Sequence, residues 1–232
     1  MIEKKLITIK NLQKKICYFF KNERLLKTAL THSSYTNEVK SACKNNERLE
    51  FLGDAVISLV LAHHLFKTFP NEPEGELTKI RAYFACDDSL SQFAQSINLG
   101  DYLIMGKGEI HAGGRTRHSI LEDAFEALTG AIYLDGGFIA AKNFIIRFLP
   151  QKINLKEIEN SADYKTKLQE IVQQSSDKKI EYVLCKESGP DHDKVFEIEL
   201  KLNSKVVGRG QGKSKKRAEQ NAAKNALEAL NR

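Results

Sequence analysis

The sequence predicts an all-α part followed by a small α+β part. Apolar residues recur at helical spacing through most of residues 1–150, where almost no run alternates apolar and polar side chains. Beyond residue 160 the period changes, because three runs alternate as half-buried antiparallel strands do. We therefore expect a first domain over 1–150, a linker over 151–160 and a second domain over 161–232.

The composition is typical of a soluble globular protein. Of 232 residues, 41% are hydrophobic and 28% are charged, and the net charge is +6. The longest nearly apolar run, Ala55 to Ala62, is far shorter than the roughly 20 residues of a membrane span. The N-terminal residues mix charges and lead into no apolar segment, so we expect no secretory signal and a cytoplasmic location. The four cysteines are widely spaced along the chain, so we expect them to be reduced thiols.

Two strongly apolar helices are expected in the first part. One lies between Phe51 and Leu65, with Asn46 as a candidate N-cap whose side chain could accept from free amide groups. The other runs from Ser119 to Tyr133 and stops at Asp135-Gly136-Gly137. Weaker helical patterns cover residues 10–21, 23–30, 87–97 and 138–148, and a further helix is expected from Glu74, after the loop of Pro70 and Pro73.

The second part is expected to have the order α-β-β-β-α. Its predicted elements are a helix from Asp163 to Gln174, strands Ile180–Lys186, Val195–Leu202 and Lys205–Gly212, and a closing helix from Ser214. Small and apolar residues on one side of the closing helix could lie on the sheet. They are Ala218, Ala222, Ala226, Leu227 and Leu230.

Positive charge is concentrated in the second part. Residues 163–232 hold 15 basic and 11 acidic residues, and the run from Lys205 to Arg217 holds six basic residues and no acidic one. Such a run attracts phosphate backbones, although a solvated surface patch would have the same composition. The charge alone does not decide between these two interpretations.

Carboxylates stand at helical spacing in both apolar helices. Glu47, Glu50 and Asp54 share one helix face, and Asp123 and Glu126 are three residues apart on the other helix. Carboxylates in a buried helix cost several kcal/mol each unless they are paired or bind a cation. Solvent-facing acids on amphipathic helices are the alternative for each pair taken singly. The two pairs together favour a cation site.

An all-oxygen ligand set favours Mg²⁺ or Mn²⁺ over zinc or copper. Each acidic helix also contains a glycine, Gly53 in one and Gly130 in the other. These glycines would allow the two helices to approach closely enough to share the ion.

One segment resembles the ribonuclease III signature. It is Asn46-Glu47-Arg48-Leu49-Glu50-Phe51-Leu52-Gly53-Asp54-Ala55-Val56. Asp123-Ala124-Phe125-Glu126-Ala127 resembles the second acidic motif of that family. The likeness extends to Thr31-His32-Ser33-Ser34-Tyr35, to Glu74-Gly75-Glu76-Leu77-Thr78 and to the tail, which resembles a double-stranded-RNA-binding domain. It covers nearly the whole chain, and the five features occur in the family's order.

The resemblance implies a ribonuclease III helical endonuclease domain followed by an α-β-β-β-α double-stranded-RNA-binding fold. It implies metal binding by Glu50, Asp54, Asp123 and Glu126, with Asp54 and Glu126 catalytic. Glu47 and Glu74 match acids that support the site or the dimer contact. The chain departs from the family at Glu122, where a small residue is more usual. We expect Glu122 to face solvent.

The resemblance also implies a reaction. It is the divalent-metal-dependent cleavage of double-stranded RNA to 5′-phosphate and 3′-hydroxyl ends with short 3′ overhangs, using Mg²⁺, for which Mn²⁺ could substitute. Processing of ribosomal RNA and mRNA is the expected role, and a homodimer is the expected assembly. Phe51 would enter a pocket of the partner subunit, although periodicity alone is equally consistent with Phe51 in its own core.

Three regions of the tail match the RNA-contacting regions of the double-stranded-RNA-binding fold. The implied RNA-binding residues are Gln169 and Glu170 in the first helix, His192 in the loop after the first strand, and Lys213, Lys215 and Lys216 at the start of the last helix.

Other interpretations remain open at this stage. The chain could be a catalytically silent double-stranded-RNA-binding adaptor, although such a relative should lack at least one of the four acids. A metal-free nuclease using two of the six histidines would leave the acids unexplained. The loop Gly113–His118 could contact RNA phosphates or be an ordinary solvated loop.

Overall fold

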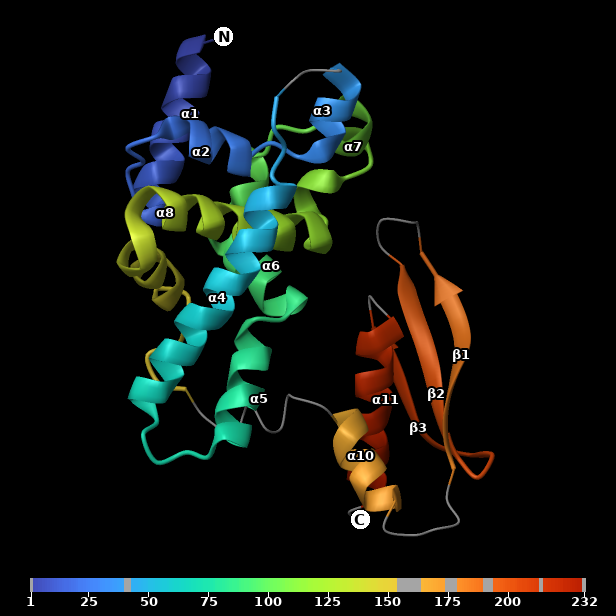
Figure 1. Ribbon diagram of the computed structural model, residues 1–232. Helices are drawn as coiled ribbons and strands as arrows, with labels where there is room; N and C mark the ends of the chain where they lie inside the picture. Colours follow the sequence, from blue (N-terminus) through green and yellow to red (C-terminus); the bar gives the residue numbers. More distant parts are fainter. Residues whose placement is uncertain are drawn as a thin grey trace. The chain divides into compact units, whose positions relative to one another are not determined.

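The computed structural model describes residues 2–39, 43–153, 164–173, 179–189, 194–212 and 215–230. They form two compact units, Met1–Ile153 and Asn154–Arg232, which we call the helical unit and the small unit (Figure 1). The expected succession of an all-α part and an α+β part is confirmed.

The helical unit is built from helices alone. Within residues 2–39 and 43–153 the structure has no strand, and only an isolated bridge joins Thr31 to Ile104. Its elements are α1 (Ile2–Ile16), α2 (Glu23–Ala29), α3 (Ser33–Val39), α4 (Glu47–Thr68), α5 (Glu74–Phe84), α6 (Asp87–Ser96), η1 (Leu99–Tyr102), α7 (Lys107–His111), η2 (Gly114–Thr116) and α8 (His118–Ile146).

Helices α4 and α8 cross in direct backbone contact. A Cβ atom on Gly53 would lie 1.8 Å from the backbone oxygen of Glu126, and one on Gly130 would lie 2.3 Å from that of Leu49. Any side chain at either position would therefore force the helices apart. The expected role of the two glycines is confirmed, and their contact places the acidic segments of α4 and α8 side by side (Figure 1).

Aromatic side chains fill the core behind this crossing. Phe125 of α8 is fully buried, and its ring lies 5.1 to 5.8 Å from the rings of Phe93, Phe144 and Phe148. Such ring pairs add to the stability gained from burial alone. The cluster fixes α6 and the end of α8 against the acidic part of α8.

Helix α8 is broken at Gly137, where the backbone has φ 74° and ψ −172°. The predicted helix end before residue 138 is therefore correct in position, although the next helical segment follows it directly, without a loop. The Asp135 carboxylate accepts hydrogen bonds from the Tyr18 hydroxyl at 2.7 Å and from the backbone amides of Lys21 and Asn22 at 2.9 and 2.8 Å. The break thus fixes the turn between α1 and α2.

Two helix ends differ from the expectation. The first helix, predicted over 10–21, ends at Ile16 because Cys17 adopts a left-handed conformation with φ 52°. Asn46 stands at the N-cap of α4 as predicted, but its side chain makes no capping hydrogen bond. Its buried backbone acts instead: the amide donates to Thr31 and the carbonyl accepts from Leu49 and Glu50.

By length and hydropathy, α4 could cross a membrane; it is the one such helix in the part of the chain that the structure describes. Seven of its residues, among them Val56, Val60 and Leu61, are buried inside the helical unit. This burial is typical of the core helix of a globular domain.

The small unit has the predicted order of elements. They are α10 (Tyr164–Gln173), β1 (Ile180–Ser188), β2 (Val195–Leu202), β3 (Lys205–Gly212) and α11 (Lys215–Leu230). The strands form one antiparallel sheet in the order β1-β2-β3, and β1 bulges between Leu184 and Lys186. Both helices contribute to a core that includes Leu168, Ile198 and Leu200.

Helix α11 lies directly on strand β3. Cβ atoms on Gly208 and Gly210 would lie 2.3 and 2.2 Å from the backbone oxygens of Ala222 and Ala218. Glycines on the strand and alanines on the helix therefore allow backbone contact, which confirms the predicted small-residue face. This contact fixes the start of α11 relative to the sheet.

Candidate active site

The acids of α4 lie along one side of the helix. Glu50 is half-buried, whereas Glu47 and Asp54 are exposed. Burial raises the pKa of Glu50, and the charges of Asp123 and Glu47 raise it further. Glu50 is therefore close to an acid of α8 as well as to one on its own helix.

The acids of α8 are half-buried and interact with those of α4. Burial and, to a smaller extent, the charges of four neighbouring carboxylates raise the pKa of Glu126 to about 8. They are Asp54, Glu122, Glu50 and Asp123. The helix crossing thus brings together all four acids that the resemblance implies as metal ligands.

The pKa of Asp123 is influenced by both an acidic and a basic side chain. Burial raises its pKa, the charge of Asp87 raises it further, and the imidazole of His32 acts in the opposite direction. Asp87 begins α6, and His32 immediately precedes α3. Neither residue is among the site residues predicted from the sequence. Only the packing of α6 and of residues 30–34 against the acidic helices reveals them.

The expectation that Glu122 faces solvent is wrong. Glu122 is half-buried and shares a hydrogen bond with Asp87. Burial and the charges of Asp87 and Asp123 raise its pKa to about 7. Periodicity along α8 could not show this, because α6 is the element that covers this side of the helix.

The donor chemistry of the acids fits a hard divalent cation. Carboxylate oxygens are the ligands that Mg²⁺ and Mn²⁺ prefer. The raised pKa values reflect repulsion and burial that a cation would offset. As the side chains stand, no three His, Cys, Asp or Glu residues among those described form a group ready to hold a metal ion. Ligation would therefore require a change in the side-chain conformations of these acids.

Of the two supporting acids, one lies beside the site. Glu47 contributes to the raised pKa of Glu50. Glu74 lies in the first turn of α5, where its carboxylate accepts a hydrogen bond of 2.8 Å from the Thr78 hydroxyl. Among the described residues, no interaction found for Glu74 joins it to the four acids.

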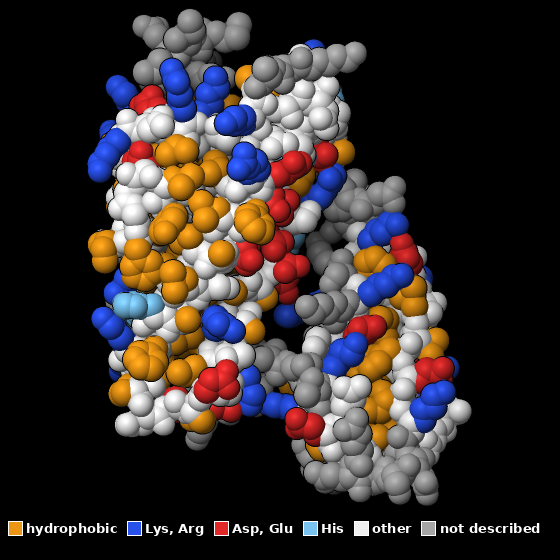
Figure 2. Space-filling model, in the orientation of Figure 1, with side chains coloured by type: hydrophobic (Ala, Val, Ile, Leu, Met, Phe, Trp, Pro, Cys, Tyr) orange, Lys and Arg blue, Asp and Glu red, His pale blue; other side chains and the backbone are white. Residues whose placement is uncertain are grey.

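An exposed apolar face lies beside the acids. It consists of Phe51, Leu59 and Phe66 on α4 and Leu134 and Ile139 on α8, each more than half exposed. Figure 2 shows hydrophobic side chains gathered on this side of the helical unit, with acidic side chains at the margin. The Phe51 ring is 82% exposed, so the alternative that places Phe51 in its own core is wrong.

Both arginines of the loop before α8 bond to other residues of the helical unit. Arg115 donates a hydrogen bond of 2.6 Å to the backbone oxygen of Gly100. Arg117 forms an ion pair of 2.6 Å with Glu109 and donates to the backbone oxygen of Ala112. Both guanidinium groups therefore brace the loop, which weakens its interpretation as a phosphate-binding segment.

In the small unit, the described RNA-binding candidates are exposed. Gln169 and Glu170 lie on α10, and Lys215 begins α11 with its ammonium group 5.9 Å from the centre of the Phe196 ring. His192 and Lys213 lie outside the described residues, as does the side chain of Lys216. The structure thus separates the described candidates onto two helices of one unit.

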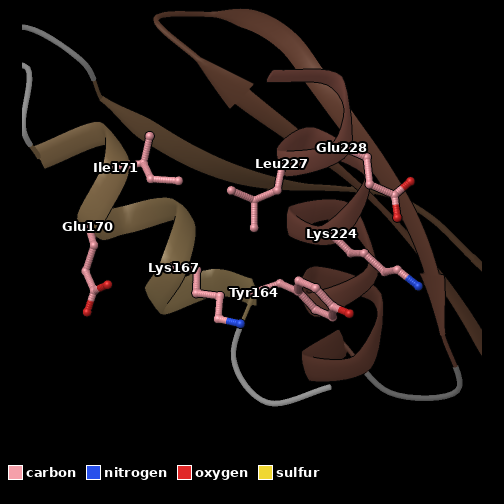
Figure 3. Close-up of a pocket in the computed structure, with 7 residues that line it drawn as sticks. All are labelled: Tyr164, Lys167, Glu170, Ile171, Lys224, Leu227 and Glu228. Carbon is pink, nitrogen blue, oxygen red and sulfur yellow. The ribbon is translucent and has the colours of Figure 1, made fainter. Parts of the chain in front are cut away.

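A groove of about 540 Å³ lies between α10 and α11. It is lined by Tyr164, Lys167, Glu170, Ile171, Lys224, Leu227 and Glu228 (Figure 3). Leu227 points into the groove, whereas Glu170 extends away from it (Figure 3). Lys165 joins the elements nearby, since its ammonium group pairs with Glu219 at 2.6 Å and lies 4.5 Å from the Tyr182 ring centre.

Two family models match the chain. A Ribonuclease-III-like model matches residues 22–153, and a double-stranded RNA binding motif model matches residues 164–230. The two matches correspond to the helical unit and to the small unit.

Curated relatives cover nearly the whole chain. This chain is 50% identical over 212 residues to Ribonuclease 3 of Borreliella afzelii, and the matched region covers 91% of this chain and 86% of that protein. It is 48% identical over 229 residues to Ribonuclease 3 of a Geobacillus species, covering 98% and 93%.

Solved structures resemble the helical unit. A nuclease domain of ribonuclease III from Campylobacter jejuni is 43% identical, with a TM-score of 0.57 over 62% of this chain and 98% of that one. A second structure of that domain is 44% identical, with a TM-score of 0.56 over 60% and 94%, and is described as flexible in a region involved in dimer formation.

Proposed function

Because the chain belongs to the ribonuclease III family, we propose that its helical unit hydrolyses double-stranded RNA that its small unit binds. The chain is thus an endoribonuclease. The observation that carries the proposal is the meeting of Glu50, Asp54, Asp123 and Glu126 where α4 crosses α8. These four carboxylates match the acidic motifs of the family.

The four carboxylates are the proposed ligands of a divalent cation, Mg²⁺, for which Mn²⁺ could substitute. A bound cation would supply Lewis acidity toward the phosphate and a lower pKa for water at the site. The chain's own contribution begins with a proton: Glu126, with a pKa of about 8, must lose its proton before it can bind a cation. Asp54 and Glu126 are the proposed catalytic pair.

The small unit is the proposed RNA anchor. Domains of this fold recognise the shape of the duplex over about 16 base pairs, through 2′-hydroxyl and phosphate contacts. Gln169, Glu170 and His192 would lie in minor grooves. Lys213, Lys215 and Lys216 would contact phosphates at the start of α11, where the helix dipole adds to their charge.

The apolar face supports a homodimer. An exposed patch of large apolar side chains marks an interaction site in a soluble protein. Phe51 is its most exposed member, and a groove of about 430 Å³ adjoins the patch through Ile139, between the end of α1 and the second segment of α8. Ile16, Ala140 and Phe144 also line this groove. We place Phe51 of one subunit in the corresponding groove of its partner.

The products and the biological role follow from the same family membership. The proposed products carry 5′-phosphate and 3′-hydroxyl ends and short 3′ overhangs, because each subunit of the dimer would cut one strand. The proposed role is processing of ribosomal RNA and mRNA in the cytoplasm.

Substitution of the acids tests the active-site assignment. Asp54→Asn and Glu126→Gln should each abolish duplex cleavage in Mg²⁺ and leave duplex binding within about twofold of the unsubstituted protein, because binding rests on the small unit. Glu23→Gln, at an exposed acid on α2, is the matched control and should cleave normally. Retained cleavage by both active-site variants would refute the assignment, and an intact duplex with the unsubstituted protein would indicate an adaptor.

A further inference from the structure

The N-terminal part of the helical unit carries an excess of positive charge. Residues 9–31, which include the end of α1 and the whole of α2, hold six basic residues and a single acidic one. The ammonium group of Lys15 is turned inward, 3.5 Å from the backbone oxygen of Ile97 and 5.6 Å from the Tyr102 ring centre. The other five basic residues are exposed to solvent. They are Lys10, Lys14, Lys21, Arg24 and Lys27.

Tertiary hydrogen bonds place the end of α2 beside the acidic start of α4. The Thr31 hydroxyl donates to the backbone oxygen of Lys27 at 2.7 Å, and the Thr31 carbonyl accepts from the amide of Asn46 at 2.9 Å. Lys27 lies in the last turn of α2, and Asn46 immediately precedes α4. Two hydrogen bonds through one residue therefore join the basic helix to the helix that carries Glu50 and Asp54.

The start of α4 adds two exposed cations, Lys44 and Arg48. Together with Arg24 and Lys27 they form what we call the basic surface. Within the part of the chain that the structure describes, none of these four side chains forms an ion pair with a carboxylate. Figure 2 shows basic side chains gathered over the end of the helical unit that α1 and α2 form, next to acidic side chains. The basic surface is thus uncompensated positive charge beside the site.

Helix stability explains only one of these cations. Lys27 lies in the last turn of α2, where the helix dipole favours a positive charge. Arg24 and Arg48 lie in the first turns of α2 and α4, where the dipole opposes one. Each arginine follows an acid, Glu23 or Glu47, but adjacent residues of a helix do not face each other. The arginines therefore fit an anion from outside the chain better than a role within their helices.

A duplex held at the acids supplies such anions. The carboxylates of the site repel RNA, so the substrate gains from positive charge nearby. Every nucleotide of a strand carries a phosphate, and a strand whose scissile phosphate reaches the acids carries its next phosphates over the neighbouring surface. The end of α2 and the start of α4 are part of that surface.

We propose that the basic surface is an RNA contact of the helical unit itself, which binds backbone phosphates of the duplex next to the bond that is cut. The inference rests on the proposed function, because it takes the acids of α4 and α8 to be the place of cleavage. A solvated patch with no ligand is the alternative, and it predicts no change in RNA binding when the charges are removed.

The two residues of α2 give the sharpest test, because they lie on a different helix from the acids. Full-length Arg24→Gln/Lys27→Gln is titrated with a fluorescent RNA duplex in EDTA at several salt concentrations. The slope of log affinity against log salt should fall by about 1 for each lost phosphate contact, hence by about 2. In Mg²⁺ the KM for duplex cleavage should rise about 10-fold or more. The kcat should stay within about twofold, because the contact is equal in the ground and transition states.

Two matched variants separate a phosphate contact from a change in net charge. Lys67→Gln/Lys152→Gln removes the same charge from exposed lysines elsewhere on the helical unit, one of them in the last turn of α4. It should keep both the salt slope and the KM. Arg24→Lys/Lys27→Arg keeps both charges of the basic surface and should retain most of the slope, because a phosphate accepts from either side chain.

An unchanged slope and KM in Arg24→Gln/Lys27→Gln, equal losses in Lys67→Gln/Lys152→Gln, or a fall in kcat with an unchanged slope would overturn the proposal. Should the α2 variant fail to fold, Lys44→Gln tests the same surface from the segment before α4, and an unchanged slope there would refute it. Failure of the proposed function is distinguishable, because the unsubstituted protein would then leave duplex RNA intact in Mg²⁺, whereas the salt slope in EDTA requires no cleavage.

Discussion

Seven carboxylates are linked by electrostatic interactions where α4, α6 and α8 meet. They are Glu47, Glu50, Asp54, Asp87, Glu122, Asp123 and Glu126. Their burial and mutual repulsion raise the pKa of Glu122 to about 7 and that of Glu126 to about 8. At neutral pH the metal-free site therefore retains protons that a cation must displace.

The raised pKa values make the stability of the metal-free protein depend on pH. The pKa of Glu126 is 4.5 in the unfolded chain and about 8 in the folded one, so its contribution is fully present below pH 4.5 and is lost as pH rises to 8. The melting temperature in EDTA should fall from pH 5.5 to pH 8.5, and Mg²⁺ should reverse the fall. Glu126→Gln should remove most of the decline. A melting temperature in EDTA that rises over this range would contradict the assignment.

Glu122 should shift the pH dependence of cleavage. Its charge adds to the raised pKa of Glu126, so Glu122→Gln should let Glu126 ionise at lower pH. The pH of half-maximal cleavage in saturating Mg²⁺ should fall, while Gln keeps the size of the side chain and a hydrogen bond to Asp87. Glu23→Gln on α2 is again the control. An unchanged midpoint would mean that Glu122 has no influence on the reaction.

At the scale of elements, the crossing of α4 and α8 is the contact on which the site depends. Gly53→Ala would place a methyl group 1.8 Å from the backbone oxygen of Glu126, and it should reduce the free energy of unfolding by about 3 kcal/mol. Denaturant unfolding of the full-length protein measures the change. Cleavage should fall as well, because the acids of the two helices would move apart.

A second helical glycine provides the matched control. Gly75 of α5 has no atom within 4 Å of the position that a Cβ would occupy. Gly75→Ala should therefore raise the free energy of unfolding by about 0.5 to 1 kcal/mol, through helix propensity alone. Equal effects of the two substitutions would show that α4 and α8 are not in backbone contact.

Elements with a strong periodicity of apolar residues were predicted well, whereas elements that depend on tertiary contacts were not. The apolar helices and the three strands follow from spacing and turn residues. The short helices α3 and α7 were missed because seven and five residues carry too little periodicity. Asn46 stands at the predicted N-cap, but its side chain does not cap the helix: the Asn46 backbone amide instead donates a tertiary hydrogen bond to the carbonyl of Thr31.

At the scale of the whole molecule, the apolar face should hold two copies together. Phe51→Ala would remove the most exposed large ring of this face, and the dimer dissociation constant should rise by about 10-fold or more, as for a central aromatic contact. Sedimentation over a range of protein concentrations measures it. Leu184→Ala, at an exposed apolar residue of the small unit, should leave assembly unchanged. A monomeric unsubstituted protein would refute the dimer.

The four acids and their helices were predictable because spacing along a helix fixes which residues share a face. Glu122, Asp87 and His32 were not, because α6 and the segment before α3 come to the site from elsewhere in the chain. Their placement depends on packing that no local pattern encodes. The sequence therefore did not predict the residues that surround the four acids.

The central claim is that the crossing of α4 and α8 forms a metal-dependent site for cutting duplex RNA. The most direct test incubates the full-length protein with a long, perfect RNA duplex in Mg²⁺ or in EDTA, followed by sizing of the products and analysis of their ends. We predict short duplex products with 5′-phosphates in Mg²⁺ and intact RNA in EDTA. Equal cleavage in both, or intact RNA in both, would contradict the claim.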